Sequence, residues 1–390
     1  MKILIVNDWT SIGGGMERYL ELVTETLRRR GDEVRVLAAA VGDGVASDYP
    51  VVTSDRAAAQ AVLQLANPWA IGAARRAVRE WKPDVALVAM FEMRLSPAVI
   101  RALGRVPFVL SVGYYKPICP TGLRLLPDGR LCDVRAGRVC LASGCLGHGH
   151  WLRDQVRYAL IRRQIDRASA VLACSAYLRD ELAAAGIPAQ WAPFPARSAG
   201  EAPLRRPASD PIFLYAGRFA PEKGVETLVA AFAQARAVLP GARLRLVGGG
   251  PLERRLGALV EEFGVGDSVD MLDWCSHERL DALMVDSWAV VVPSLWAEPF
   301  GLVALDATVR RVPVVVSDAG GLREIVEDGV NGIRVPRGEV APLAEALVRI
   351  GSSELFPTGS IPARIAARTA EMHDPGRHVA WLRRRLEEAT

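Results

Sequence analysis

The chain has 390 residues, of which 50% are hydrophobic and 24% charged, and its formal net charge is +4. This composition excludes a disordered chain, a collagen-like repeat and a small disulfide scaffold. The apolar runs, such as 85–90 and 289–293, are shorter than the roughly 20 residues of a membrane span, and no dense basic stripe for duplex nucleic acid is present. We therefore expect a cytoplasmic protein of two domains without a nucleic-acid partner.

Short runs rich in valine, isoleucine and leucine alternate with longer segments of helical periodicity. This alternation is the pattern of a parallel sheet with helices on both faces. In the first half the predicted strands are Lys2–Val6, Val34–Ala39, Val85–Ala89, Phe108–Val112 and Ala170–Cys174. In the second half they are Ile212–Ala216, Arg243–Val247, Val269–Leu272, Ala289–Val292 and Pro313–Ser317. The predicted fold class is therefore α/β, with two Rossmann-like, doubly wound domains facing a cleft.

The domain boundary is predicted in Ala192–Pro211, which contains five prolines and has the composition of a linker. We expect an N-terminal domain over 1–195, which includes a cysteine-rich segment at 119–145, and a C-terminal domain over 196–370. The remaining residues, 371–390, form an amphipathic helix that is able to pack back on the N-terminal domain.

Both halves place candidate anion-binding residues after their first strand. Gly14 and Gly15 occupy a strand-to-helix turn, where backbone N–H groups can approach an anion. The corresponding turn of the second half carries Arg218 and Lys223, two cations that suit a diphosphate. The alternatives are a tight turn for the glycines and ordinary surface charge for the cations.

A third motif follows the predicted strand at 289–292. Glu298 stands just before a helix expected to begin near residue 300, and Asp306 lies on that helix. Carboxylates accept hydrogen bonds from sugar and ribose hydroxyls, although a helix cap is an alternative role for Glu298. Further donors are the unpaired N–H groups at the helix start, those of Phe300, Gly301 and Leu302.

The order and spacing of these motifs resemble the retaining nucleotide-sugar glycosyltransferases of family 4, which have the GT-B fold. The most specific matches are Gly217-Arg218 with Lys223-Gly224, the Glu-Pro-Phe-Gly block at 298–301, and the segment 316–326. The resemblance implies transfer of a sugar from a nucleotide-diphosphate donor to a hydroxyl acceptor, which is a polysaccharide, a lipid or a natural product.

The resemblance also implies roles for single residues. Catalytic roles fall on Glu298, Arg218 and Lys223, where the two cations grip the diphosphate and Glu298 holds the donor sugar. Asp306 would contact the ribose, and the loop 272–275 would flank the base. The remaining donor contacts would come from Gly14, Gly15, Phe300, Gly301 and Leu302. Catalysis would require no cofactor, because the cations stabilise the leaving group.

The chain departs from the family at two positions. The acid at position 306 is usually Glu, and position 113 is usually a His that contacts the donor sugar. Gly113 implies a donor without a 6-hydroxyl, compensation by Tyr114 or Tyr115, or a weakened enzyme. The alternative functions are therefore a catalytically weakened nucleotide-sugar-binding partner subunit, or a phosphorylase or epimerase of the same fold.

Four cysteines cluster in one segment, at Cys119, Cys132, Cys140 and Cys145. A structural zinc site is the leading specific interpretation in a cytosolic protein. The spacing lacks close Cys-x-x-Cys pairs, so independent buried thiols and redox pairing remain alternatives.

The segment 151–167 carries Leu152, Val156 and Leu160 at four-residue spacing among five arginines. A basic amphipathic helix of this kind can lie on a membrane, which would place the protein at the inner membrane face. Because the stripe has only three aliphatic residues, packing on its own domain is the favoured interpretation.

Overall fold

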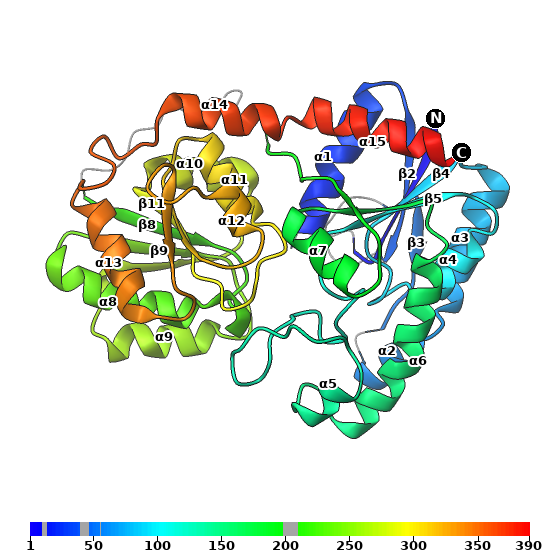
Figure 1. The fold of residues 1–390 in the computed structure, drawn as a ribbon, viewed down its shortest axis with the longest axis horizontal. Helices are drawn as coiled ribbons and strands as arrows, with labels where there is room; N and C mark the ends of the chain where they lie inside the picture. Colours follow the sequence, from blue (N-terminus) through cyan, green and yellow to red (C-terminus); the bar gives the residue numbers. More distant parts are fainter. Residues whose placement is uncertain (10–13, 40–46, 55, 198–209) are drawn as a thin grey trace. The chain divides into compact units, whose positions relative to one another are not determined.

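The computed structural model describes the chain except residues 10–13, 40–46, 55 and 198–209 (Figure 1). The chain forms two compact units. Unit 1 comprises residues 1–128, 132–195 and 375–390, and unit 2 comprises residues 129–131 and 196–374.

Unit 1 is built on a seven-stranded parallel sheet in the order β3-β2-β1-β4-β5-β6-β7. Its strands are β1 (Lys2–Asn7), β2 (Glu33–Ala39), β3 (Tyr49–Val51), β4 (Val85–Val88), β5 (Phe108–Val112), β6 (Ala170–Ala173) and β7 (Gln190–Trp191). Its helices are α1 (Gly15–Arg29), α2 (Ala57–Leu63), α3 (Pro68–Glu80), α4 (Ala98–Ala102), α5 (Arg138–Ala142), α6 (His148–Ile165), α7 (Ala176–Ala184) and α15 (Pro375–Ala389).

Unit 2 is built on a six-stranded parallel sheet in the order β10-β9-β8-β11-β12-β13. Its strands are β8 (Ile212–Ala216), β9 (Arg243–Val247), β10 (Val269–Leu272), β11 (Ala289–Val292), β12 (Val314–Ser317) and β13 (Gly332–Val335). Its α-helices are α8 (Val225–Val238), α9 (Glu253–Glu262), α10 (His277–Asp286), α11 (Leu302–Val309), α12 (Leu322–Ile325), α13 (Val340–Gly351) and α14 (Ala363–Met372). Two 3-10 turns complete it, η1 (Pro221–Lys223) and η2 (Gly266–Ser268).

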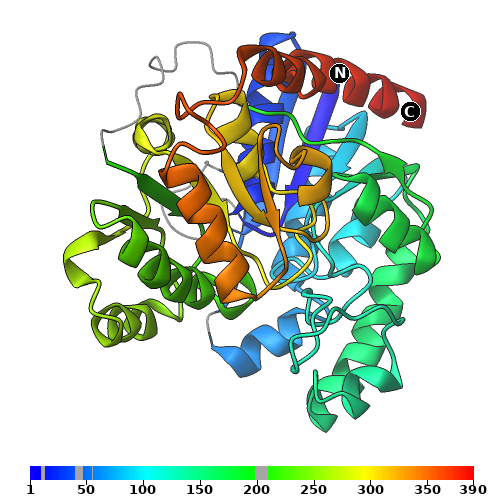
Figure 2. The same cartoon turned by 60° about the vertical axis from the view of Figure 1, so that its left-hand side comes forward.

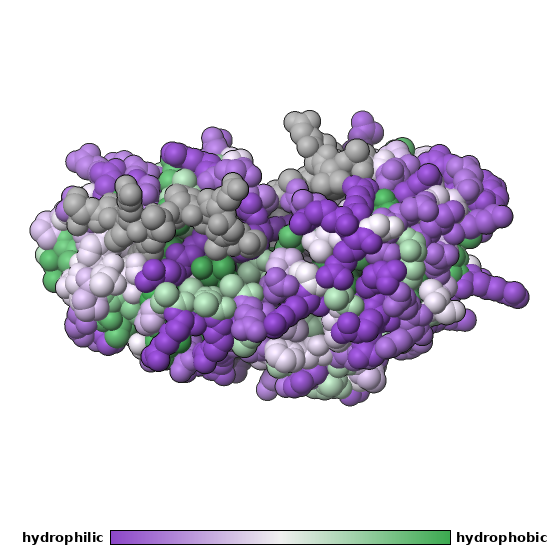
Figure 3. All heavy atoms as spheres, turned by 90° about the horizontal axis from the view of Figure 1, so that it is seen from above, coloured by the Kyte–Doolittle hydropathy of each residue, from purple (hydrophilic) through white to green (hydrophobic). Residues whose placement is uncertain are grey.

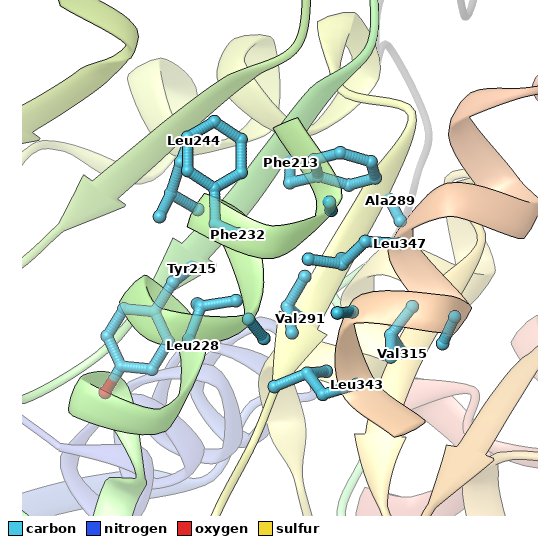
Figure 4. Close-up of a cluster of buried hydrophobic side chains, with 14 of the residues drawn as sticks. Phe213, Tyr215, Leu228, Phe232, Leu244, Ala289, Val291, Val315, Leu343 and Leu347 are labelled. Carbon is cyan, nitrogen blue, oxygen red and sulfur yellow. The ribbon is translucent and has the colours of Figure 1, made fainter. Parts of the chain in front are cut away.

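The predicted α/β fold with two parallel sheets is confirmed, and all ten predicted strands are present. Strands such as β11 are apolar throughout because helices cover both faces of the sheet. In unit 2, Phe232 of α8 and Leu347 of α13 pack with Phe213 and Val291 of the strands (Figure 4). The sequence did not predict β3, β7 or β13, which are strands of two to four residues at sheet edges.

The C-terminal helix α15 belongs to unit 1 and lies against α1 (Figures 1 and 2). It buries Val379, Leu382 and Leu386. The Tyr19 hydroxyl of α1 and His378 Nε2 of α15 are 3.2 Å apart and form a buried hydrogen bond. Helix α15 also packs against β4 and β5 of the first sheet. The hydrogen bond thus joins two residues that are 359 positions apart in the sequence.

Helix α6 packs on unit 1 through a different face from the one predicted. Leu152 and Val156 of the predicted stripe are exposed, whereas Asp154, Arg157 and Ile161 are buried. The helix therefore packs on its own domain, as predicted, but not through the aliphatic stripe. The polar residues face inward because Asp154 and Arg157 form an ion pair of 3.4 Å, which makes their burial tolerable.

No helix among the described residues is both long and apolar enough to cross a membrane. The face of the molecule seen in Figure 3 carries mainly hydrophilic side chains outside the grey atoms.

Candidate functional site

The turn after β8 is shaped by glycine. Gly224 has a φ of 66° and links η1 to α8, and a Cβ atom there would lie 2.0 Å from the carbonyl oxygen of Pro293. Only glycine combines this left-handed conformation with so close a backbone approach. The Tyr215 hydroxyl donates to the carbonyl oxygen of Arg218 at 2.7 Å and fixes the first part of the turn to the core. The turn therefore holds Arg218 and Lys223 at the carboxyl end of β8.

Each of these two cations pairs with a carboxylate of unit 2. Lys223 Nζ donates to Glu298 Oε1 at 2.7 Å and lies 4.6 Å from the centre of the Trp296 ring. Arg218 forms an ion pair with Glu222. The structure thus brings together the predicted residues Lys223 and Glu298, which are 75 positions apart in the sequence.

Glu298 is a buried carboxylate, 7% exposed. Its Oε1 also accepts a hydrogen bond of 2.6 Å from the Ser294 hydroxyl. Burial would raise the pKa of Glu298, but the charge of Lys223 and the hydrogen bonds from Lys223 and Ser294 lower it below its usual value. Glu298 is therefore ionised at neutral pH, and in this state both of its oxygens act only as hydrogen-bond acceptors, which suits contact with hydroxyl groups.

The backbone at Glu298 is fixed by a glycine pair after β12. The N–H of Gly321 donates to the Glu298 carbonyl oxygen at 2.7 Å. Gly320 has a φ of 64°, and a Cβ atom there would lie 2.3 Å from the same carbonyl oxygen. The segment 316–326 thus orients Glu298 through the backbone.

Helix α11 begins at Leu302, two residues after the predicted start. Gly301 caps it with a φ of 113°, and Phe300 is buried, with its ring 5.7 Å from that of His373. The amides of Phe300, Gly301 and Leu302 therefore lie at or just before the N-terminal end of α11, where the helix dipole favours an anion.

Asp306 lies inside unit 2, with 1% of its surface exposed. Its Oδ1 is 3.8 Å from Arg310 Nη1, and Arg310 also donates to Asp281 at 2.7 Å. The structure thus places Asp306 beside a buried arginine at the C-terminal cap of its helix.

In unit 1, Gly14 caps α1 and Gly15 is its first residue. Both are exposed, and Gly14 is extended with a φ of −149°. The third glycine of the loop, Gly13, lies outside the described residues.

Gly113 follows β5 against an apolar surface. A Cβ atom there would lie 2.8 Å from Met16 Sδ and 2.8 Å from Phe194 Cζ. The space that a larger residue would need is therefore filled by these two side chains. Of the two tyrosines predicted to compensate, Tyr115 is fully buried. Tyr114 is partly exposed, and its hydroxyl lies 2.8 Å from Glu92 Oε1 and 2.9 Å from the Ala89 carbonyl oxygen.

Sequence reasoning missed a buried acidic pair in unit 1. Asp8 follows β1 and Glu92 follows β4, the two strands between which the sheet order reverses direction. Ligands collect at such a switch point in open α/β sheets. Asp8 accepts three backbone N–H bonds of 2.7–2.8 Å from residues 93–95. Burial, and then the Asp8 charge, raise the pKa of Glu92 to about 7. The sequence carries one signal for this pair, because Asp8 and Glu92 each come shortly after an apolar run that was predicted to be a strand.

The four cysteines predicted to bind a structural zinc ion all lie in the described part of the chain. Cys119 and Cys140 are buried and Cys132 and Cys145 partly buried, and no disulfide joins them. Among the residues that the structure describes, no group of three or more His, Cys, Asp or Glu side chains is placed to hold a metal ion.

Two family models match the chain in succession. The model described as Glycosyltransferase Family 4 matches residues 13–192, and the model described as Glycosyl transferases group 1 matches residues 198–366. The chain belongs to the group 1 glycosyltransferases. The second match includes the Lys223–Glu298 pair and the glycine pair that orients Glu298.

Comparisons with single proteins agree with this glycosyltransferase family. D-inositol 3-phosphate glycosyltransferase of Mycobacterium bovis is 34% identical over 180 residues, which are 45% of this chain and 36% of that protein. The chain spans only 14% to 36% of the length of the curated relatives it matches.

Two solved structures establish the GT-B fold over nearly the whole chain. Sucrose-phosphate synthase from Thermosynechococcus elongatus matches with a TM-score of 0.74 and 22% identity, covering 100% of this chain and 99% of that one. Anabaena HepE in complex with UDP-glucose matches with a TM-score of 0.68 and 19% identity, covering 98% and 99%.

Proposed function

We propose that the protein is a retaining glycosyltransferase that moves a sugar from a nucleoside diphosphate donor to a hydroxyl acceptor. The observation that carries the proposal is the pairing of Lys223 with Glu298 at 2.7 Å beside the glycine turn after β8. A cation for phosphate and a carboxylate for sugar hydroxyls meet there, as recognition of both halves of a nucleotide sugar requires.

The chemistry expected of this site is electrostatic. Negative charge develops on the diphosphate as the bond to the sugar breaks, and preorganised donors stabilise that charge. Arg218, Lys223 and the amides at the start of α11 are the donors that we assign to this role. Glu298 holds the sugar. As the family resemblance implies, the acceptor hydroxyl attacks the sugar carbon from the face that the diphosphate leaves, and its proton passes to the departing diphosphate. The resemblance assigns Gly14 and Gly15 to the distal phosphate and Asp306 to the ribose, and these roles stay predictions.

We propose a uridine nucleotide as the first donor to test, because the similar HepE structure holds UDP-glucose. The acceptor is proposed only as a hydroxyl compound. We also propose that the protein acts in the cytoplasm, with membrane contact through the exposed Leu152 and Val156 of α6 as an option.

The test is thermal stabilisation by UDP, GDP and dTDP, since a ligand that binds only the folded state raises the melting temperature. One nucleotide should raise it, and Arg218→Ala or Lys223→Ala should abolish the rise. Arg254→Ala is the matched control, because Arg254 is exposed on α9. The absence of any rise would contradict the proposal.

A second candidate function is a nucleotide-sugar-binding subunit without transferase activity. The observation in its favour is that Met16 and Phe194 fill the space beside Gly113. Such a subunit would show the thermal shift yet leave UDP-glucose unconsumed with every acceptor tried. An epimerase, in contrast, would convert UDP-glucose without any acceptor.

A further inference from the structure

Both cations assigned to the diphosphate are already neutralised inside unit 2. Arg218 pairs with Glu222, and Lys223 pairs with Glu298. The two cations differ in exposure: the Arg218 side chain is 56% exposed and that of Lys223 22%, whereas the carboxylate partners Glu222 and Glu298 are both buried, at 7% and 10%. Partly buried charges interact more strongly than exposed ones because solvent screens them less. The pairing of Lys223 with Glu298 is therefore the contact with which an incoming phosphate must compete.

The hydrogen bonds of Glu298 show what this competition requires. The Lys223 ammonium and the Ser294 hydroxyl both donate to the same oxygen, Oε1, at 2.7 and 2.6 Å. If Lys223 turns to a phosphate, this buried carboxylate loses its charged donor. Leaving a buried charge short of a partner is costly. A sugar hydroxyl beside Glu298 would supply the missing donor, whereas a nucleoside diphosphate without sugar would not.

We propose that Glu298 is an electrostatic lock on Lys223, and that the intact nucleotide sugar opens it by supplying phosphate to the lysine and hydroxyls to the carboxylate together. This inference rests on the proposed function. Binding of the diphosphate by Lys223 and binding of the sugar by Glu298 are then coupled, so each contact increases the affinity of the other. The lock makes the site favour a sugar-bearing nucleotide over the free nucleoside diphosphate that is the product.

Glu298→Gln tests the lock, because the amide keeps the size of the side chain and removes its charge. Titration calorimetry measures the affinity for UDP and for UDP-glucose, or for GDP or dTDP and its glucose ester if that nucleotide gives the thermal shift. The variant should bind the nucleoside diphosphate about threefold more tightly or better, because Lys223 is released. The preference for the sugar-bearing form should fall by about threefold or more.

Two further variants make the result decisive. Glu226→Gln removes the same charge from α8, where Glu226 pairs with the exposed Arg255 at 3.2 Å, and it should leave both affinities unchanged. Ser294→Ala removes the other donor to Oε1, which increases the dependence of Glu298 on Lys223. It should weaken binding of the nucleoside diphosphate, and it tests the lock even if Glu298→Gln does not fold.

The outcomes separate this inference from the proposed function. If no nucleotide binds the wild type, the proposed function fails and the inference falls with it. If a nucleotide binds and Glu298→Gln leaves its affinity unchanged or weaker, the lock is wrong although the donor site stands. Equal tightening of the nucleoside diphosphate and its sugar ester would also overturn the inference, because the two recognitions would then be independent.

Discussion

Replacement of Glu92 by Gln should change how the stability of the protein depends on pH. Glu92 is fully buried, and its pKa is raised from 4.5 to about 7, first by burial and then by the Asp8 charge. The unfolded chain releases this proton near pH 4.5, whereas the folded protein holds it up to about pH 7. The stability that Glu92 contributes is therefore complete below pH 4.5 and is lost as the pH rises through 7.

The size of the effect follows from the pKa shift. At about 1.4 kcal/mol per pKa unit, the wild type should lose about 3 kcal/mol between pH 4.5 and 7 relative to Glu92→Gln. Urea unfolding, followed by circular dichroism from pH 5 to 8, measures this difference. Glu80→Gln, which removes an exposed carboxylate from α3, is the control. Parallel stability curves for the wild type and Glu92→Gln would refute the reasoning.

Tyr114→Phe should move the wild-type transition to higher pH, because the tyrosine hydrogen bond lowers the Glu92 pKa; a shift of the transition to lower pH in the same urea series would contradict this. Gly224→Ala should cost more than about 2 kcal/mol of unfolding free energy, since it combines a positive φ with a backbone clash. Gly257 lies in the interior of α9 with open space around it, so Gly257→Ala should instead stabilise the folded protein by about 0.5–1 kcal/mol. Equal effects of the two alanine substitutions on the melting temperature would count against the assigned geometry. Stoichiometric zinc in the purified protein, measured by atomic emission, would show that Cys119 and its neighbours rearrange to bind metal, and its absence would support independent thiols.

The sequence alone determined the fold class and the donor-side motifs. Parallel strands that are buried on both faces are apolar throughout. Runs such as 289–292 can therefore be recognised as strands from the sequence alone. Arg218 and Lys223 follow such a run directly, and Glu298 follows another, so their place at the carboxyl ends of strands was readable from the chain.

The tertiary structure decided which of these residues meet and in what state. The Lys223–Glu298 pair joins positions 75 residues apart, and the hydrogen bond between Tyr19 and His378 joins positions 359 apart. Burial raises the pKa of Glu92, and packing against the rest of unit 1 decides that Asp154 and Arg157 of α6 are buried. Both depend on all the residues packed around a side chain. Local sequence spacing carries no record of such contacts, because they form only when distant segments fold against one another.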